Sequence, residues 1–368
     1  MSARRKKMLD EKILKEGEAA VWRLRSLYKK YGYMPFKMSK FEEYDLYVRN
    51  KDFLQGNGVI TFSDTGGELL ALKPDVTLSI IKNTTDRKGC VSKVYYDENV
   101  YRISGATSRF KEIMQTGIEA IGDIDGYSRF EVLTLAAKSL AVISERYVID
   151  ISHMGIVSAM LASVGAEGEV LARLSRLISE KNSHEITSIL SEIGASEAAA
   201  ERLITLTGLY GKAQTVLPML KALCSGVCDE AYSELASLME LLTEAGYGDR
   251  ARIDFSVINN MSYYNGIVFR GFIDGIPEGV LAGGEYGALM KSMGRTSEAI
   301  GFAIYLDMLE GLSASRTEYD VDVLLLYENG TSPATVAEKV REITTDGRTV
   351  SAQCDIPEKL RYRQLVRL

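Results

Sequence analysis

The chain has 368 residues, 46% of them hydrophobic and 26% charged, which is typical of a globular protein long enough for two or three domains. Its formal net charge of −6 argues against a non-specific nucleic-acid binder. No apolar run approaches the roughly 20 residues that a membrane-spanning helix needs, and the basic start MSARRKK lacks the apolar run of a secretory signal, so we expect a cytoplasmic protein.

Cysteines and histidines are too few for several common kinds of site. Cys224 and Cys228 lie four residues apart on a predicted helix, but a zinc site would need two more ligands, and His153 and His184 are the only histidines. We interpret the cysteines as reduced thiols and expect no metal and no other cofactor. The sequence also lacks a GxxxxGK[ST] loop and a GxGxxG after a strand, which argues against P-loop and dinucleotide-binding proteins.

The first part of the chain alternates helices with short strands. Apolar residues at helical spacing predict a helix from about Leu9 to Tyr31, capped by Gly32, and Pro74 is placed to begin a later helix. The predicted elements that follow the first helix are a strand YDLYV (44–48), a hairpin (58–72, turning at 64–67), a helix (75–84), two long strands (91–103 and 110–122) joined by a polar loop (104–109), a helix (128–147) and a strand (148–154).

The second part begins with an Ala-, Leu-, Ser- and Glu-rich segment, about residues 155–247, that predicts an insert of five or six short helices. Strands then resume around a polar kink, Asn259-Asn260-Met261-Ser262, and a small αβ tail follows a polar linker. These predicted elements are strands at 252–258, 263–273 and 279–284, a strand running into a helix (299–312), a linker (313–317), a strand (319–327), a helix (332–344) and a strand (349–354).

The connections are mostly hairpins rather than alternating βαβα units. This pattern predicts an α+β fold in which helices flank an antiparallel sheet, with a helical insert and a small C-terminal αβ unit. We expect one domain over residues 1–312, including the insert, and a second over residues 318–368.

Several polar residues on these elements are candidates for a binding site. Gln115 and Glu119 lie four apart on one strand and therefore share a face, where they could line a polar cavity or form a solvated outer face. Asp75 and Thr77 at a helix start could belong to a site or serve only as capping residues. The glycine-rich turn LAGGEYG permits close backbone approach, but such turns are common.

The order of the landmarks is more specific than any single one. The succession LALKPDVT, YRI, RFKEIMQTGIEAIG, NNMSYYNGIVF, LAGGEYGALM and AIGFAIYLD resembles the catalytic domain of histidyl-tRNA synthetase, a class II aminoacyl-tRNA synthetase fold, over roughly residues 8–313. The resemblance implies a retained histidine pocket, with Asp75 in place of the usual glutamate and Glu119 suited to an imidazole N–H. The implied pocket residues are Asp75, Thr77, Arg102, Gln115, Glu119, Tyr263, Tyr264 and Tyr286.

The positions that handle ATP in the family differ in this chain. The arginine of motif 2 is present as Arg102, and Arg109 matches a second arginine that could contact phosphate. Ser104, Asn259 and Met308 replace, respectively, an adenine-reading glutamate and two arginines. Losing one fixed donor of this kind typically costs ~3–4 kcal/mol of transition-state stabilisation. We therefore expect no catalytic residues and no competent activation of an amino acid.

A synthetase-like chain with this defect resembles the regulatory subunit family of ATP phosphoribosyltransferase. That resemblance implies a non-catalytic subunit, required by the short-form catalytic subunit in the first step of histidine biosynthesis, that binds L-histidine for feedback inhibition. It also implies a homodimer within a hetero-octamer, and the tail, about half of an anticodon-binding domain, makes tRNA an unexpected partner. The alternatives are a divergent histidyl-tRNA ligase that activates histidine with ATP, and a paralogue that ligates or senses another amino acid.

Overall fold

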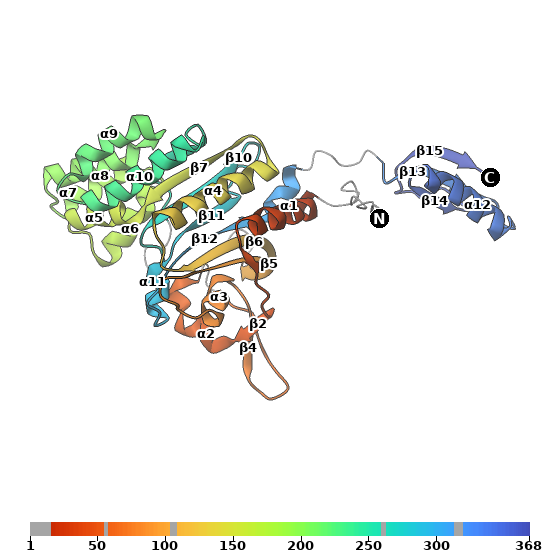
Figure 1. The fold of residues 1–368 in the computed structure, drawn as a ribbon, viewed down its shortest axis with the longest axis horizontal. Helices are drawn as coiled ribbons and strands as arrows, with labels where there is room; N and C mark the ends of the chain where they lie inside the picture. Colours follow the sequence, from red (N-terminus) through yellow and green to blue (C-terminus); the bar gives the residue numbers. More distant parts are fainter. Residues whose placement is uncertain (1–15, 55–57, 104–108, 259–262, 313–318) are drawn as a thin grey trace, which may run out of the picture. The chain divides into compact units, whose positions relative to one another are not determined.

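The structure, a computed structural model, describes residues 16–54, 58–103, 109–258, 263–312 and 319–368. The chain divides into two compact units, Met1–Glu310 and Gly311–Leu368 (Figure 1). Within the described ranges, no helix combines the length and apolar character needed to cross a membrane.

A nine-stranded sheet organises the first unit, with the strand order β1-β5-β6-β12-β11-β10-β7-β9-β8. Neighbouring strands are antiparallel except in the pairs β1–β5 and β7–β9. The strands are β1 (Met34–Pro35), β5 (Val91–Ile103), β6 (Phe110–Gly122), β7 (Tyr147–His153), β8 (Tyr210–Gly211), β9 (Ala251–Asp254), β10 (Ile267–Ile273), β11 (Leu281–Glu285) and β12 (Glu298–Tyr305).

Two long helices, α1 (Glu16–Lys30) and α4 (Gly126–Ile143), cover one face of this sheet (Figure 1). Tyr28 of α1 contacts Tyr95 of β5 and Phe302 of β12, with ring centroids 6.1 and 6.2 Å apart. Because successive side chains of a strand point to opposite faces, the residues adjacent to these two on β5 and β12 point to the other side of the sheet.

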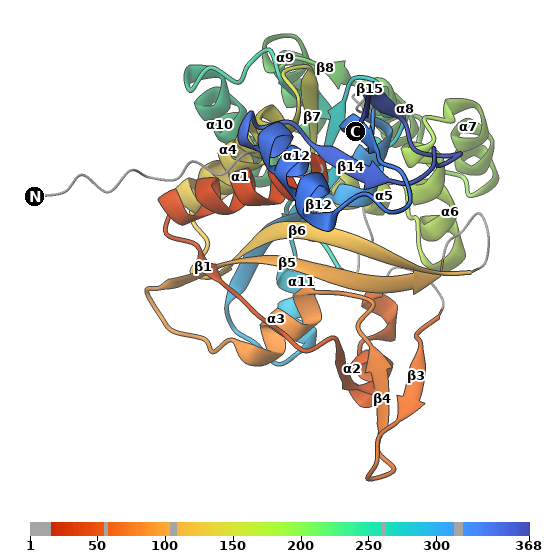
Figure 2. The same cartoon turned by 90° about the vertical axis from the view of Figure 1, so that its right-hand side faces the viewer.

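That other face carries shorter elements and a small antiparallel sheet, ordered β2-β4-β3. Figure 2 shows β5 and β6 running side by side, with α2, α3 and the small sheet below them. The elements on this side are β2 (Phe41–Glu43), α2 (Tyr44–Arg49), η2 (Lys51–Phe53), β3 (Thr61–Ser63), β4 (Leu69–Leu72), α3 (Thr77–Asn83) and α11 (Gly287–Ser292).

Six helices lie between β7 and β9, with the short edge strand β8 between the fourth and the fifth, and Figure 1 shows them gathered at one end of the sheet. They are α5 (Met154–Ser163), α6 (Gly168–Ser179), α7 (Ser183–Glu192), α8 (Glu197–Gly208), α9 (Ala213–Cys224) and α10 (Asp229–Glu244).

The second unit is a three-stranded parallel sheet, ordered β14-β13-β15, with one helix. Val323, Leu324 and Leu325 of the central strand are fully buried, which explains the uninterrupted apolar run there. The elements are β13 (Val321–Leu326), α12 (Pro333–Thr345), β14 (Val350–Gln353) and β15 (Tyr362–Arg367).

Several predicted elements are wrong in type or extent. The segment YDLYV forms the short helix α2 rather than a strand, because one turn buries Tyr47 while Asp45 and Val48 stay exposed. The helix predicted to reach Tyr147 ends at Ile143, because Tyr147 already pairs with Ile273 in the sheet.

The strand predicted for residues 252–258 stops at Asp254, whose carboxylate accepts a hydrogen bond from the Ser256 N–H at 2.8 Å and begins a turn. The polar kink at Asn259–Ser262 lies outside the described residues.

Two differences follow β12. The helix predicted after β12 is the 3₁₀ helix η3 (Leu306–Leu312). Strand β15 was not predicted, because its sequence, YRQLVR, is mostly polar.

Candidate functional site

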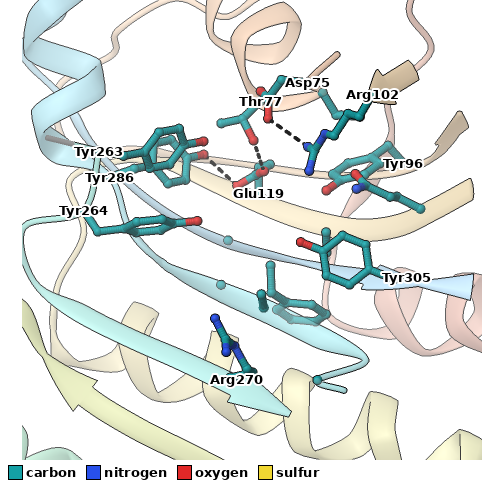
Figure 3. Close-up of a pocket in the computed structure, with 18 of the residues that line it drawn as sticks. Asp75, Thr77, Tyr96, Arg102, Glu119, Tyr263, Tyr264, Arg270, Tyr286 and Tyr305 are labelled. Atoms are coloured by element: carbon teal, nitrogen blue, oxygen red, sulfur yellow. Dashed lines mark hydrogen bonds and ion pairs between the residues drawn. The ribbon is translucent and has the colours of Figure 1, made fainter. Parts of the chain in front are cut away.

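A cavity of about 480 Å³ opens on the face of the large sheet that carries α3 (Figure 3). Strands β5, β6, β10, β11 and β12 contribute to its floor, and the start of α3 and the turn at residues 277–279 contribute to its walls. The structure brings all eight predicted pocket residues to this cavity: Asp75, Thr77, Arg102, Gln115, Glu119, Tyr263, Tyr264 and Tyr286.

Small residues in the middle of the sheet make the space. Cross-strand pairing aligns Tyr96, Gly117, Ala303, Ala282 and Arg270 in one row that crosses β5, β6, β12, β11 and β10. The three residues in the centre of this row carry at most a methyl group. The small side chains in the centre therefore leave open space above the sheet, bounded by Tyr96 at one end of the row and by Arg270 at the other.

The next row places Glu119 directly opposite Gly301. A Cβ atom on Gly301 would lie 1.7 Å from Oε2 of Glu119, a separation that no side chain tolerates. Glycine at this position of β12 thus lets the glutamate lie flat over the neighbouring strand. Gln115 and Glu119 are only 2% and 3% exposed, so the alternative of a solvated outer face is wrong.

The Glu119 carboxyl accepts two hydrogen bonds inside the cavity. The Thr77 hydroxyl donates to Oε1 at 3.0 Å and the Tyr286 hydroxyl donates to Oε2 at 2.6 Å (Figure 3). Burial raises the pKa of Glu119 to about 8, although both hydrogen bonds oppose the shift, and the nearby Asp75 adds to it. Near neutral pH this carboxyl is therefore mostly protonated and can donate a hydrogen bond to a bound base.

Asp75 has two roles, one for each oxygen. Its Oδ1 accepts a hydrogen bond from the Leu78 N–H at 3.0 Å, at the start of α3, as the capping alternative proposed. Its Oδ2 lies 3.6 Å from Nη2 of Arg102, whose Nε donates to the Pro74 carbonyl oxygen at 2.7 Å. The acid and the arginine therefore hold each other at the cavity wall.

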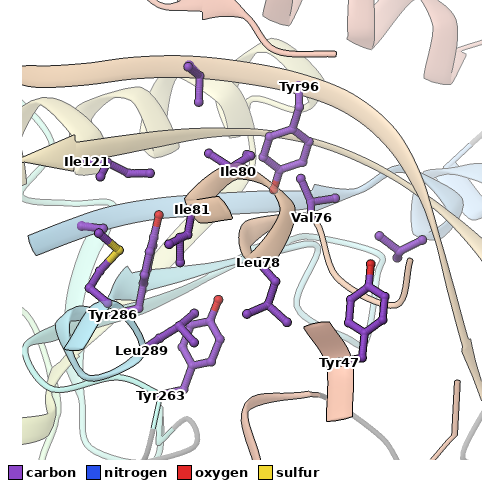
Figure 4. Packing of buried hydrophobic residues seen from close by; sticks show 14 of the residues in the cluster. Tyr47, Val76, Leu78, Ile80, Ile81, Tyr96, Ile121, Tyr263, Tyr286 and Leu289 are labelled. Carbon is purple, nitrogen blue, oxygen red and sulfur yellow. The ribbon is translucent and has the colours of Figure 1, made fainter. Parts of the chain in front are cut away.

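Three tyrosines close the other wall. The ring centroids of Tyr263 and Tyr264 are 4.5 Å apart, and those of Tyr263 and Tyr286 are 5.8 Å apart. Burial raises the pKa of all three hydroxyls well above the usual value, so they act as neutral donors. Ile81 of α3 and Leu289 of α11 belong to the apolar cluster behind them (Figure 4).

Gln115 contributes a donor that none of the described residues uses. Its Nε2 is buried and has no hydrogen-bond partner among the residues that the structure describes. Buried polar groups are nearly always paired, so an unpaired amide in a cavity wall is typical of a contact that a ligand completes.

The positions matched to ATP handling lie elsewhere. Met308 is part of η3 and does not line the cavity, while its neighbour Asp307 forms an ion pair with Lys111 at 2.5 Å. Arg109 is exposed at the bend before β6 and is likewise absent from the cavity lining. Ser104 and Asn259 lie outside the described residues.

Sequence reasoning missed several larger residues of the lining. They are Phe53, Tyr96, Arg270, Phe272, Glu278, Phe302 and Tyr305. The signal for Arg270 was present, because it is the one charged residue in the otherwise apolar strand IVFRGFI. Within the described part of the chain, no cluster of three histidine, cysteine, aspartate or glutamate side chains could hold a metal ion.

Comparisons with known proteins show which family and fold the chain resembles. The family model of histidyl-tRNA synthetase matches residues 8–309. An ATP phosphoribosyltransferase regulatory subunit from Ruminiclostridium cellulolyticum is 26% identical over 331 residues, which are 87% of this chain and 79% of that protein. A protein of the same name from Oceanobacillus iheyensis is 28% identical over 283 residues, 76% of this chain and 69% of that protein.

Solved structures share the fold. A regulatory subunit/histidyl-tRNA synthetase from Bacillus halodurans matches with a TM-score of 0.75 and 21% identity, covering 96% of this chain and 93% of that one. The ATP phosphoribosyl transferase (HisG:HisZ) complex from Thermotoga maritima matches with a TM-score of 0.62 and 20% identity, covering 81% and 98%. The expected class II synthetase-like fold and the resemblance to both families are confirmed.

Proposed function

The chain belongs to the histidyl-tRNA synthetase family, and from that premise we propose that it is the non-catalytic regulatory subunit of an ATP phosphoribosyltransferase. Its partner in this proposal is the short-form catalytic subunit, which it activates in the first step of histidine biosynthesis. The curated relatives that carry the name of this subunit, and the complex from Thermotoga maritima, support the proposal. We further propose that it works as a homodimer within a hetero-octamer in the cytoplasm.

The ligand of the cavity is L-histidine in this proposal. The observation that carries it is the buried Glu119 carboxyl, held by Thr77 and Tyr286 and with a pKa of about 8. An imidazole has an ordinary pKa of ~6.5. A neutral carboxyl and a neutral imidazole can therefore share one hydrogen bond near pH 7 without burying a net charge.

The remaining groups suit the amino-acid end of the ligand. The remaining lone pairs of the Asp75 carboxylate and the Thr77 hydroxyl can accept hydrogen bonds from an ammonium group, and the Gln115 amide, which no described residue pairs, can donate to a carboxylate. Recognition of the whole amino acid therefore comes from residues that the fold already places in one cavity.

Activation of the bound amino acid is not part of the proposed function. Forming an adenylate concentrates negative charge, and fixed cations supply most of the stabilisation of such a transition state. Met308 offers a thioether instead of a cation, and Arg102 lies beside the Asp75 carboxylate at 3.6 Å, which offsets part of its charge. The cavity thus favours binding over chemistry.

The test combines this chain with a short-form catalytic subunit. We expect phosphoribosyl transfer only when both chains are present, and a fall in rate when histidine is added. Glu119→Ala should abolish the fall, measured as the ratio of rates with and without histidine. The exposed Glu240 of α10 provides a matched control, since Glu240→Ala should keep the wild-type ratio.

A histidine- and ATP-dependent pyrophosphate-exchange assay separates this function from that of a histidyl-tRNA ligase. Absence of exchange is the expected result. Robust exchange would contradict the regulatory proposal and establish activation. Binding of a different amino acid with higher affinity than histidine, measured by calorimetry, would contradict the assignment of the ligand.

A further inference from the structure

Arg270 lies on the far side of the cavity from Glu119. Its strand, β10, is separated from the strand of Glu119, β6, by β12 and β11. Three strand spacings of about 4.8 Å place the two backbones roughly 14 Å apart. The cavity therefore has two chemically different ends, an acid at one and a guanidinium at the other.

The Arg270 guanidinium points into the cavity, between Tyr264 and Tyr305 in Figure 3. It makes no hydrogen bond or ion pair with any residue in the described ranges. Arg102, by contrast, is tied to the Pro74 carbonyl and to Asp75. The charge of Asp150 acts on the Arg270 guanidinium without a direct contact. A half-buried guanidinium without a hydrogen-bond partner has therefore lost part of its hydration and has no direct hydrogen bond in exchange.

The protein nevertheless fixes the direction of this side chain. A Cβ atom on Gly279 would lie 2.6 Å from both Cγ and Cδ of Arg270, so the backbone of the turn at residues 277–279 packs directly on the arginine stem. Only glycine permits this approach. An arginine whose stem is clamped while its head stays unpaired is preorganised for a ligand.

Nearby acids do not neutralise the guanidinium by contact. Asp150 of β7, the cross-strand neighbour of Arg270, is also the cross-strand neighbour of Arg252 on β9. One oxygen of its carboxylate is buried without a hydrogen-bond partner in the described residues. Asp254, the next acid of that region, forms an ion pair with Lys181 at 2.8 Å. Glu278 lines the cavity at an exposed position, where water screens its charge.

We propose that Arg270 is an anion-binding residue of this cavity that takes a carboxylate or phosphate group at the end opposite Glu119. Guanidinium groups bind both anions through paired N–H donors. The anion has two sources, the α-carboxylate of the amino acid held by Glu119 or a phosphate of a second ligand. A cavity of about 480 Å³ is in the range that accommodates ligands larger than an amino acid.

The carboxylate source rests on the proposed histidine site and is tested with histidine and histidinol, which lacks the carboxylate. Calorimetry on the wild-type chain and on Arg270→Met gives four dissociation constants. If the carboxylate binds Arg270, histidine should lose ~10- to 100-fold in affinity in the variant, whereas histidinol should be unaffected. Arg146→Met, at a highly exposed position, is the matched control and should change neither.

The phosphate source is tested with inorganic pyrophosphate and does not depend on histidine binding. If a phosphate binds Arg270, pyrophosphate binding should fall at least ten-fold in Arg270→Met while histidine binding persists. Gly279→Ala should reproduce the loss of whichever anion binds, because the added methyl group displaces the arginine stem. Because Gly279→Ala keeps the guanidinium in the protein, a loss of binding in this variant reports the position of Arg270 and not its removal.

The outcomes separate the two proposals. Unchanged binding of both anions in Arg270→Met would overturn the inference, and so would equal losses for histidine and histidinol, which indicate a purely structural role. A wild-type chain that binds pyrophosphate through Arg270 but does not bind histidine would overturn the histidine site alone. A wild-type chain that binds neither would overturn both.

Discussion

Glu119 binds a proton more tightly in the folded chain than in the unfolded one. Burial raises its pKa from the ordinary value of 4.5 to about 8. Between these two values the folded state carries more protons than the unfolded state, so the free energy of unfolding falls as the pH rises. At pH 7 the cost is roughly 3 kcal/mol, because each pKa unit corresponds to about 1.4 kcal/mol. Burying this carboxyl in the cavity therefore lowers the free energy of unfolding.

Replacing this carboxyl by an amide should remove the cost. We expect Glu119→Gln to unfold at a higher urea concentration than the wild type at pH 8, with the difference shrinking toward zero as the pH falls to about 5. Urea titrations at pH 5, 7 and 8 measure the effect, and Glu240→Gln at an exposed position is the control. Parallel pH dependence in wild type and Glu119→Gln would show that the carboxyl titrates normally in the folded chain.

The sequence predicts a residue of the cavity only where its position follows from the pattern of one strand or one helix. The two-residue period of a strand places Gln115 and Glu119 on one face, and the start of a helix after Pro74 places Asp75 and Thr77 together. Arg270 reaches the same cavity because β10 lies three strands from β6. That neighbourhood depends on pairing between distant segments, which no local pattern contains.

At the level of elements, β12 and the Glu119 side chain of β6 pack closely because position 301 of β12 is a glycine. We expect Gly301→Ala to destabilise the protein by about 1–3 kcal/mol, because the new methyl group would overlap Oε2 of Glu119 and approach the Ile118 carbonyl oxygen at 2.5 Å. Histidine affinity should fall at least ten-fold, since Glu119 must move. Calorimetry and urea unfolding measure the two effects.

The control for this substitution is Gly208→Ala near the end of α8. A Cβ atom there meets nothing within 4 Å, so the change should be neutral or slightly stabilising. A Gly301→Ala protein that keeps wild-type affinity for histidine would show that Glu119 is not held in the position required for binding.

The segment that leads into α3 is anchored by a buried ion pair. Lys73 is fully buried and its Nζ lies 2.6 Å from Oε2 of Glu98 on β5, while its backbone bonds to Lys40 and Tyr101. We expect Glu98→Leu to cost up to ~3 kcal/mol, because it leaves the buried ammonium unpaired. Adding Lys73→Met should recover most of that loss in urea unfolding. A double variant no more stable than Glu98→Leu would contradict this account.

Element types were predictable where the apolar pattern is long, as in β5, β6 and the helices of the insert. The segment YDLYV was not, because its aromatic and β-branched residues favour a strand while packing of Tyr47 selects a helix. β15 was missed for a related reason. Its polar residues lie at the edge of a small sheet, and pairing with the apolar β13 decides its conformation.

At the scale of the whole molecule, the proposed binding site lies in one of the two units. Every residue that lines the cavity lies between Phe53 and Tyr305, within the unit Met1–Glu310. The single tryptophan, Trp22 in α1, lies in the same unit. Its fluorescence therefore reports the unfolding of the part of the chain that carries the site.

We expect a chain that ends after Leu312 to keep the histidine affinity of the full chain and the same midpoint of the Trp22 fluorescence transition in urea. The physical reason is that the truncation removes no cavity residue and no strand of the nine-stranded sheet. Calorimetry with histidine and urea unfolding of both chains make the measurement, with Glu119→Ala in the short chain as the control for specific binding. A short chain that folds with an unchanged transition but no longer binds histidine would place part of the site in Gly311–Leu368 and contradict the assignment of the whole pocket to the first unit.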